Sequence, residues 1–388
     1  MKRNTIFGII GILIPLVISC IKTYEPVIES KDEVKFVVTG QVNRGDQIQN
    51  VNISTTSPVS SPKYFPVTGC IVKILDAKGN IYNTLDKNDG NYEAVIPEIE
   101  LSPGSKFKVD ILIPDGTKIV SDFDEINDCP AVDSIYYTVD TLPSVNPYLS
   151  TKGIQFYVNL NAENVSSRYF RWEAIETYEF RAVYPIEWIY DGKVHHIVPP
   201  DLSRKICWKT VIVKKVFTLT TKNLAQNKYN MLPLHFVDNF SSPRLVYGNS
   251  LFLRQYALSE AAFDYWEKIR INSFEQGGLY EKQPLSVKGN MHNISNPDQQ
   301  ILGFFGASTV TSKRIFVQNV ENLPLEYNPG CGIEFEKPRQ SFVGISTLSY
   351  PVYLYATPYG YLIIILEPYC YDCRRDGGDT IKPAYWPY

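Results

Sequence analysis

The sequence predicts a mainly β protein with two domains and one packed helix. Most apolar segments are short, rich in β-branched or aromatic residues, and separated by turn signals such as Asp115-Gly116. Aromatic residues make up 13% of the chain and include 27 tyrosines, which favour strands. Only one segment has clear helical spacing. We expect an N-terminal immunoglobulin-like β-sandwich over residues 34–125 and a larger antiparallel β domain, barrel- or sandwich-like, over residues 126–388.

The first twenty residues have the features of a secretory signal. A positive start, Lys2-Arg3, precedes the almost wholly apolar residues 6–18. That run is shorter than the roughly 20 apolar residues that span a bilayer, but it suits a signal peptide. It ends at Val17-Ile18-Ser19-Cys20, which resembles the lipobox of bacterial lipoproteins. We expect residues 1–19 to be cut off and Cys20 to be acylated. The alternative is an ordinary signal peptide, or a buried segment, with an incidental cysteine.

Acylation would place the mature chain at a membrane, outside the cytoplasm. Each buried methylene group contributes roughly 0.8 kcal/mol to membrane partitioning, so several acyl chains anchor a protein almost irreversibly. The longest later apolar stretch, residues 361–366, is only strand-sized. The polar residues 20–33 then read as a tether that carries the folded body.

The proposed sandwich contains strand candidates at regular, short intervals. They are bounded by turn signals, as in immunoglobulin-type sandwiches, although the Cys-Trp-Cys hallmark of antibody domains is missing. These candidates are residues 34–39, 47–56, 71–75, 81–85, 92–95, 107–113 and 118–121.

The second domain has longer strand candidates and the one helix. The strands are residues 133–137, 153–160, 169–184, 211–220, 251–258 and 309–317. In the third of these, we expect Glu173, Glu176 and Glu179 to be solvated. Ser259 is a good helix N-cap, and Phe263, Trp266 and Ile269 follow with helical spacing, which predicts a helix near 259–273 that docks on the sheet.

The cysteines indicate an oxidising compartment. Besides Cys20 there are six, an even number in an exported chain, and this favours disulfides. Cys370 and Cys373 have CxxC spacing in a turn-rich C-terminal strap, but a second metal-binding pair is missing. We expect them to form structural disulfides, with Cys207 and Cys331 as partners; metal binding is the alternative. The sequence assigns no role to Cys70 or Cys129.

No catalytic, metal or cofactor signature is found in the sequence. It lacks GxSxG, HExxH and GxxxxGK[ST]. His195 and His196 are adjacent, so a strand would direct their imidazoles to opposite faces, which disfavours a shared metal. The net charge is −3 and the basic residues are dispersed, so we expect no nucleic-acid partner. These observations favour a binding protein over an enzyme.

Several segments together resemble the Bacteroidetes outer-membrane lipoproteins grouped as domain of unknown function 4249. The most telling are QYALSEAAFDYW at 255–266, GNMHNI at 289–294 and LGFFGAS at 302–308. The others are Cys20 with residues 24–26, and residues 66–72, 133–137, 169–173, 207–208, 283–284, 296–297, 370–373, 377–378 and 386.

The resemblance implies a location more than a reaction. Members of this family look like partners of TonB-dependent outer-membrane receptors in nutrient uptake, and no catalytic residue comes with them. We therefore expect a lipid-anchored, non-enzymatic accessory that docks on such a receptor or binds a small ligand, glycan or peptide. The alternative is a surface or periplasmic hydrolase acting on glycans or peptides. Since no acidic run follows Cys20, either leaflet of the outer membrane fits.

Overall fold

The computed structural model describes residues 34–58, 61–142, 150–274, 287–331, 345–364 and 367–387. The expected signal peptide, Cys20 and the tether lie outside these residues. The described chain is mainly β with several antiparallel sheets and one α-helix, which confirms the predicted fold class. No helix in the described ranges is long and apolar enough to cross a bilayer.

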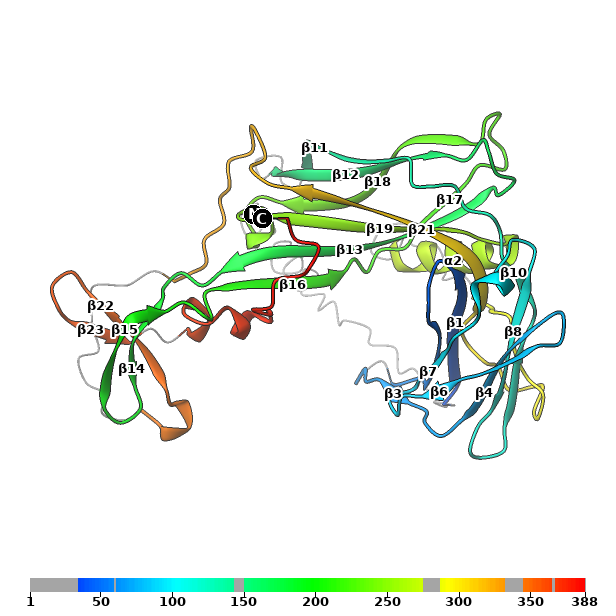
Figure 1. Cartoon of the computed structure of the whole chain (residues 1–388), viewed down its shortest axis with the longest axis horizontal. Coiled ribbons are helices and arrows are strands. Elements are labelled where there is room, and N and C mark those ends of the chain that lie inside the picture. Colours follow the sequence, from blue (N-terminus) through cyan, green and yellow to red (C-terminus); the bar gives the residue numbers. More distant parts are fainter. Residues whose placement is uncertain are drawn as a thin grey trace, which may run out of the picture.

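Two facing sheets form a sandwich in the first part of the chain (Figure 1). Their inward side chains share one core, to which Val38 and Ile53 contribute from one sheet and Phe107 and Ile111 from the other. One sheet contains β1 (Phe36–Arg44), β2 (Gln49–Thr55), β3 (Phe65–Pro66), β6 (Leu85–Asp86) and β7 (Asn91–Ala94). The other contains β4 (Ile71–Asp76), β5 (Ile81–Asn83), β8 (Lys106–Leu112), β9 (Lys118–Ser121), β10 (Asp124–Glu125) and β20 (Met291–Asn293).

A second pair of sheets faces each other across a separate core. Phe156 and Val158 lie opposite Trp172 and Leu253 there. The larger sheet contains β13 (Tyr169–Arg181), β16 (Ile206–Ile212), β17 (Phe217–Thr220), β19 (Asn249–Ala257) and β21 (Phe305–Val317). The smaller contains β11 (Ser134–Leu142), β12 (Thr151–Asn161) and β18 (Lys228–Asp238).

One strand joins the two sandwiches. β21 pairs antiparallel with β19 and parallel with β1, from Gly40 opposite Phe305 to Arg44 opposite Thr309. A single ten-stranded sheet therefore runs through both sandwiches. Figure 1 shows β21 passing from the long horizontal layer to the upright strands of the first sandwich. The domain boundary at residue 125 stays a prediction, and the strand pairing crosses it.

The helix α2 (Glu260–Phe274) agrees with the predicted helix to within one residue at each end. It begins where the Ser259 hydroxyl accepts a hydrogen bond from the amide of Ala262, a normal N-cap interaction. Phe263 packs with Tyr256 on the outer face of the larger sheet, as the predicted apolar stripe requires.

A small distal sheet and the C-terminal strap complete the described chain. The distal sheet contains β14 (Ile186–Tyr190), β15 (Val194–Asp201), β22 (Val352–Ala356) and β23 (Leu362–Ile364), at the left of Figure 1. In the strap, the backbone of Asp379 bonds to Trp208 of β16 and covers that edge strand. Single 3-10 turns lie at Glu98–Glu100, Pro243–Leu245, Thr347–Ser349, Pro368–Cys370 and Cys373–Asp376.

Candidate functional site

The four cysteines singled out from the sequence form two buried disulfides. Cys207 is bonded to Cys373 and Cys331 to Cys370. The first bond fastens the strap to the edge strand β16, and the second fastens it to the segment before the distal sheet. Cys70 and Cys129 are buried free thiols. The disulfides stabilise the C-terminal strap, and their burial makes them unsuitable as a reactive site.

The histidines of the distal sheet lie at its exposed surface. His195 Nε2 lies 2.8 Å from Asp191 Oδ1, and the ring of His196 stacks on Trp188 with centroids 3.8 Å apart. In the described residues, no cluster of three His, Cys, Asp or Glu side chains could hold a metal ion.

The prediction that Glu173, Glu176 and Glu179 are solvated is wrong for two of them. Glu176 and Glu179 are 1% and 5% exposed, whereas Glu173 is half-buried and accepts a hydrogen bond from Tyr256. The reason is that β13 is an interior strand of the ten-stranded sheet, and the smaller sheet of the second sandwich covers the face that carries Glu176.

Buried Glu176 gathers three polar partners. Asn249 Nδ2 donates to its Oε1 over 2.6 Å, and His235 Nε2 and Arg244 Nη1 lie 3.4 Å and 3.5 Å from its Oε2. Burial opposes ionisation, but these partners, His235 first, outweigh it and lower the pKa of Glu176. The carboxylate is therefore held charged inside the protein, where it stabilises the packing of β13, β18 and β19 and is not offered to a substrate.

The most site-like feature is the segment made of β20, the two residues before it and the loop after it, which we call the pinned loop (residues 289–303). Its base is closed by the buried Asn290, whose Nδ2 donates to Phe305 O over 2.8 Å and whose Oδ1 accepts from Phe305 N over 2.9 Å. The base is also too narrow for a side chain, because a Cβ on Gly289 would lie 1.5 Å from Gly303 O. The loop is thus fixed where it enters and where it leaves.

Further hydrogen bonds fix the interior of the pinned loop. Asn293 Nδ2 donates to Gln299 Oε1 over 2.7 Å, and Asn293 Oδ1 accepts from Asn296 N over 2.9 Å. The Ser295 hydroxyl accepts from the amide of Lys118, at the start of β9. A loop held at so many points loses little conformational entropy when a ligand binds.

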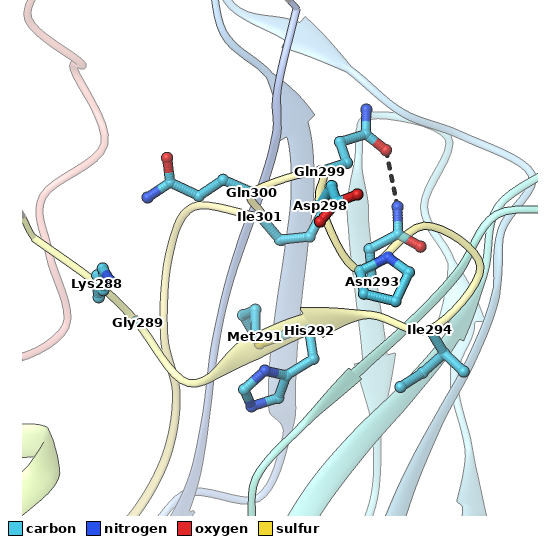
Figure 2. Close-up of a pocket in the computed structure, with 11 residues that line it drawn as sticks. Lys288, Gly289, Met291, His292, Asn293, Ile294, Asp298, Gln299, Gln300 and Ile301 are labelled. Carbon is cyan, nitrogen blue, oxygen red and sulfur yellow. Dashed lines mark hydrogen bonds between the residues drawn. The ribbon is translucent and has the colours of Figure 1, made fainter.

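The pinned loop lines a pocket of about 870 Å³ that is open to solvent (Figure 2). This volume is within the range of ligand-binding clefts. Figure 2 shows the Asn293–Gln299 pair on one side of β20 and the imidazole of His292 on the other, where it lies 3.0 Å from Asp122 Oδ2. The lining residues are Lys288, Gly289, Met291, His292, Asn293, Ile294, Pro297, Asp298, Gln299, Gln300 and Ile301.

The pocket lies beside the point where the described chain begins. Lys35 Nζ donates to Gln300 Oε1 over 3.0 Å, and the backbone of Leu302 bonds to Phe36 and Val38 of β1. A tether that precedes residue 34 would therefore be attached to the folded part of the chain next to the pocket.

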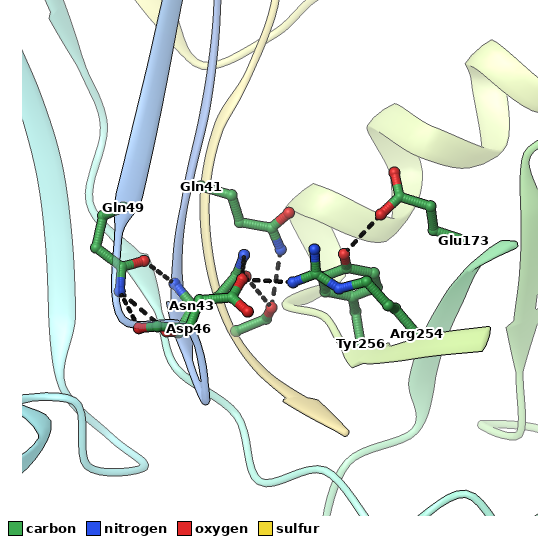
Figure 3. Close-up of polar contacts among 8 residues, drawn as sticks. Gln41, Asn43, Asp46, Gln49, Glu173, Arg254 and Tyr256 are labelled. Atoms are coloured by element: carbon green, nitrogen blue, oxygen red, sulfur yellow. Dashed lines mark hydrogen bonds and ion pairs between the residues drawn. The ribbon is translucent and has the colours of Figure 1, made fainter. Parts of the chain in front are cut away.

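A polar cluster lies where the two sandwiches meet, beyond the C-terminal end of β1 (Figure 3). Arg254 of β19 pairs with Asp46, which follows β1, and the hydroxyl of Tyr256 donates to Glu173 over 2.9 Å. Burial, together with Glu173, raises the pKa of Tyr256. Behind it, the guanidinium of Arg171 lies between the rings of Tyr256 and Trp266, 4.4 Å and 4.3 Å from their centroids. The Arg254–Asp46 pair holds the first sandwich against β19, and the other contacts fix α2 and β13 against the same strand.

The sequence held one signal for this site, the GNMHNI and LGFFGAS segments, but it did not reveal their role. Their asparagine and glycines build the closed base of the pinned loop. Comparison with known families matches residues 21–314 to the family described as domain of unknown function (DUF4249). No curated protein matches the chain.

Proposed function

Since the chain belongs to the DUF4249 family, for which no activity is described, we propose that it is a lipid-anchored binding or docking accessory of a TonB-dependent uptake system at the outer membrane. The observation that carries the binding role is the pre-formed pocket of the pinned loop. Its polar lining includes the three amides of Asn293, Gln299 and Gln300, which bind polar ligands and do not exchange protons at ordinary pH. This composition favours binding over hydrolysis.

The lipid anchor is supported by the sequence around Cys20. Residues 20–33 would span up to about 50 Å when extended, at about 3.5 Å per residue. Such a tether would leave the body beside Lys35 and the pocket, and would let both reach a receptor in the same membrane.

The test is a pull-down from outer membranes in mild detergent, with an affinity tag at the C-terminus and identification by mass spectrometry. We expect a β-barrel receptor to co-purify. Mass analysis of the N-terminal peptide should show an acylated Cys20, and Cys20→Ser should release the chain from the membrane fraction. Recovery of a monodisperse chain with no partner contradicts the docking role, and an unmodified Cys20 contradicts the anchor.

A further inference from the structure

We propose that the free edge of β11 is an interface between two copies of this chain, in which the two β11 strands pair antiparallel across a two-fold axis. The smaller sheet of the second sandwich, at the top of Figure 1, would then continue from one copy into the other. Three observations carry the inference: β11 is a long and regular edge strand, its outward backbone groups are accessible, and its sequence complements itself. The inference does not depend on the proposed function.

Most other edge strands of the described chain are protected against pairing. Proteins protect edges with short strands, prolines, bulges, charged side chains or a covering segment. The strap covers β16, and β5, β6 and β23 have at most three residues. β15 carries Pro199-Pro200, and the free part of β21 carries Lys313. β18, the other edge of the sheet that contains β11, has Pro233 and two register shifts against β12.

β11 has none of these protective features. It pairs with β12 without a register shift over nine residues, from Ser134 to Leu142. Its sequence, SIYYTVDTL, contains no proline and no lysine, and Asp140 is the only charged residue in it. Tyrosine, isoleucine, valine and threonine, which make up most of the strand, favour β structure. A long edge of this kind is a template for a further strand.

Half of the backbone groups of β11 point outward from the sheet edge. Asn239 N donates to Lys152 O, so the backbone of residue 152 and of its partner Thr141 points away from the β11–β12 bonds. The bonding direction alternates along an antiparallel pair. The outward residues are therefore Ile135, Tyr137, Val139 and Thr141. None of them is buried, and no backbone bond joins them to another part of the described chain.

The sequence of β11 complements itself when its middle residue, Thr138, lies on the two-fold axis. Thr138 then faces Thr138 of the second copy, and Tyr137 faces Val139. Threonine pairs and aromatic–β-branched pairs are favourable across antiparallel strands. Asp140 faces Tyr136 of the second copy, so no two like charges meet. In this register every outward residue of one copy is opposite an outward residue of the other.

This pairing would also extend the core of the second sandwich. Ile135 and Tyr137 pack only partly against that core, and Val139, on the same face, is 43% exposed. In the dimer these side chains would lie beside those of the second copy. Nine residues extend over about 30 Å. A contact one strand wide is small beside the roughly 800 Å² per partner of a standard interface, so we expect a reversible dimer.

Register-specific cross-linking tests the pairing. Thr138→Cys places a thiol on the two-fold axis, where the opposite Cα atoms would lie about 4.5 Å apart, within the range of a disulfide. Thr141→Cys is the matched control, because the same change three residues along the strand would separate the two thiols by about 20 Å. Cys70 and Cys129 are buried and do not compete. The purified full chain is oxidised with copper phenanthroline and analysed on a non-reducing gel.

A second pair of variants tests the affinity in solution. Val139→Lys places a charge at the interface, whereas Val183→Lys makes the same change at a residue that is 38% exposed just after β13. Analytical ultracentrifugation of the full chain in mild detergent measures the Kd of the dimer. Hydrogen exchange at the amides of Tyr137 and Val139 is followed in the wild type above and below that Kd.

We expect Thr138→Cys to give at least tenfold more cross-linked dimer than Thr141→Cys. The wild type and Val183→Lys should form a dimer of equal affinity, and Val139→Lys should raise the Kd at least tenfold. The amides of Tyr137 and Val139 should exchange at least tenfold more slowly in the dimer than in the monomer.

The proposal is overturned if the wild type is monomeric at every concentration, or if Thr138→Cys cross-links no more than Thr141→Cys. A monomer in which the amides of Tyr137 and Val139 exchange slowly would show that another segment of the same chain covers the edge. A monomer that loses a co-purified receptor in Val139→Lys would show that the edge binds that receptor. Both of these outcomes also overturn the pairing of two copies.

Discussion

Asn290→Ala tests whether one buried side chain closes the pinned loop. The substitution removes both hydrogen bonds to the backbone of Phe305, of 2.8 Å and 2.9 Å, in a buried place. It leaves one backbone donor and one acceptor without their partner, and each buried orphan costs about 1–3 kcal/mol. Allowing for partial relaxation, we expect the free energy of unfolding to fall by about 2–4 kcal/mol.

Urea unfolding followed by tryptophan fluorescence measures this loss, and hydrogen exchange shows where it acts. Residues 289–303 should exchange faster, while the distal sheet should be unchanged. Asn296→Ala is the matched control, because Asn296 lies in the same loop and is exposed. If Asn290→Ala unfolds at the same urea concentration as Asn296→Ala and leaves the exchange of the loop unchanged, the argument that Asn290 closes the loop is refuted.

Three further predictions concern groups outside the loop. Cys207→Ser opens a disulfide whose cysteines are 166 residues apart, and Cys331→Ser opens one whose cysteines are 39 residues apart. Chain entropy predicts that the free energy of unfolding falls by about 5 kcal/mol in the first variant and by about 4 kcal/mol in the second. A larger loss in Cys331→Ser than in Cys207→Ser would contradict this reasoning. Because the pKa of Glu176 is lowered in the folded state, its carboxylate contributes fully to stability above the unfolded-state pKa, and this contribution is lost as the pH falls through the folded-state pKa. In urea unfolding, Glu176→Gln should therefore reduce the loss of stability that the wild type shows as the pH falls. Burial raises the pKa of Cys129 to about 11, so iodoacetamide at pH 8 should modify it only after unfolding, and rapid labelling of the native chain would disagree.

The elements that the sequence predicted well are those that a local pattern determines. β8 alternates buried Phe107, Val109 and Ile111 with more exposed residues, which is the period of a strand with one face in a core. The helix α2 starts at a side-chain cap, and Ser259 supplies that cap in the sequence as well as in the structure. Neighbouring residues carry the information in both cases.

The features that the sequence did not reveal depend on residues far apart in the chain. Periodicity shows which face of a strand is buried, but not which strand covers it, so the parallel pairing of β1 with β21 was not predicted. For the same reason Glu176 was placed in solvent, although His235, from a different sheet, covers it. The bond from Asn290 to Phe305 joins two loop ends and follows no period, so the pinned loop was not predicted either.

The position of the pinned loop determines which strands a bound ligand would stabilise. The loop leaves β20, the edge of one sheet of the first sandwich, and enters β21, the strand that both sandwiches share. A ligand that binds only the folded form of this loop would stabilise it by about 2.7 kcal/mol at a concentration of 100 times its Kd. That energy is comparable to the expected cost of Asn290→Ala. The Arg254–Asp46 pair lies beyond the other end of β1, so we expect this stabilisation at the loop and at the start of β21, where β21 pairs with β1.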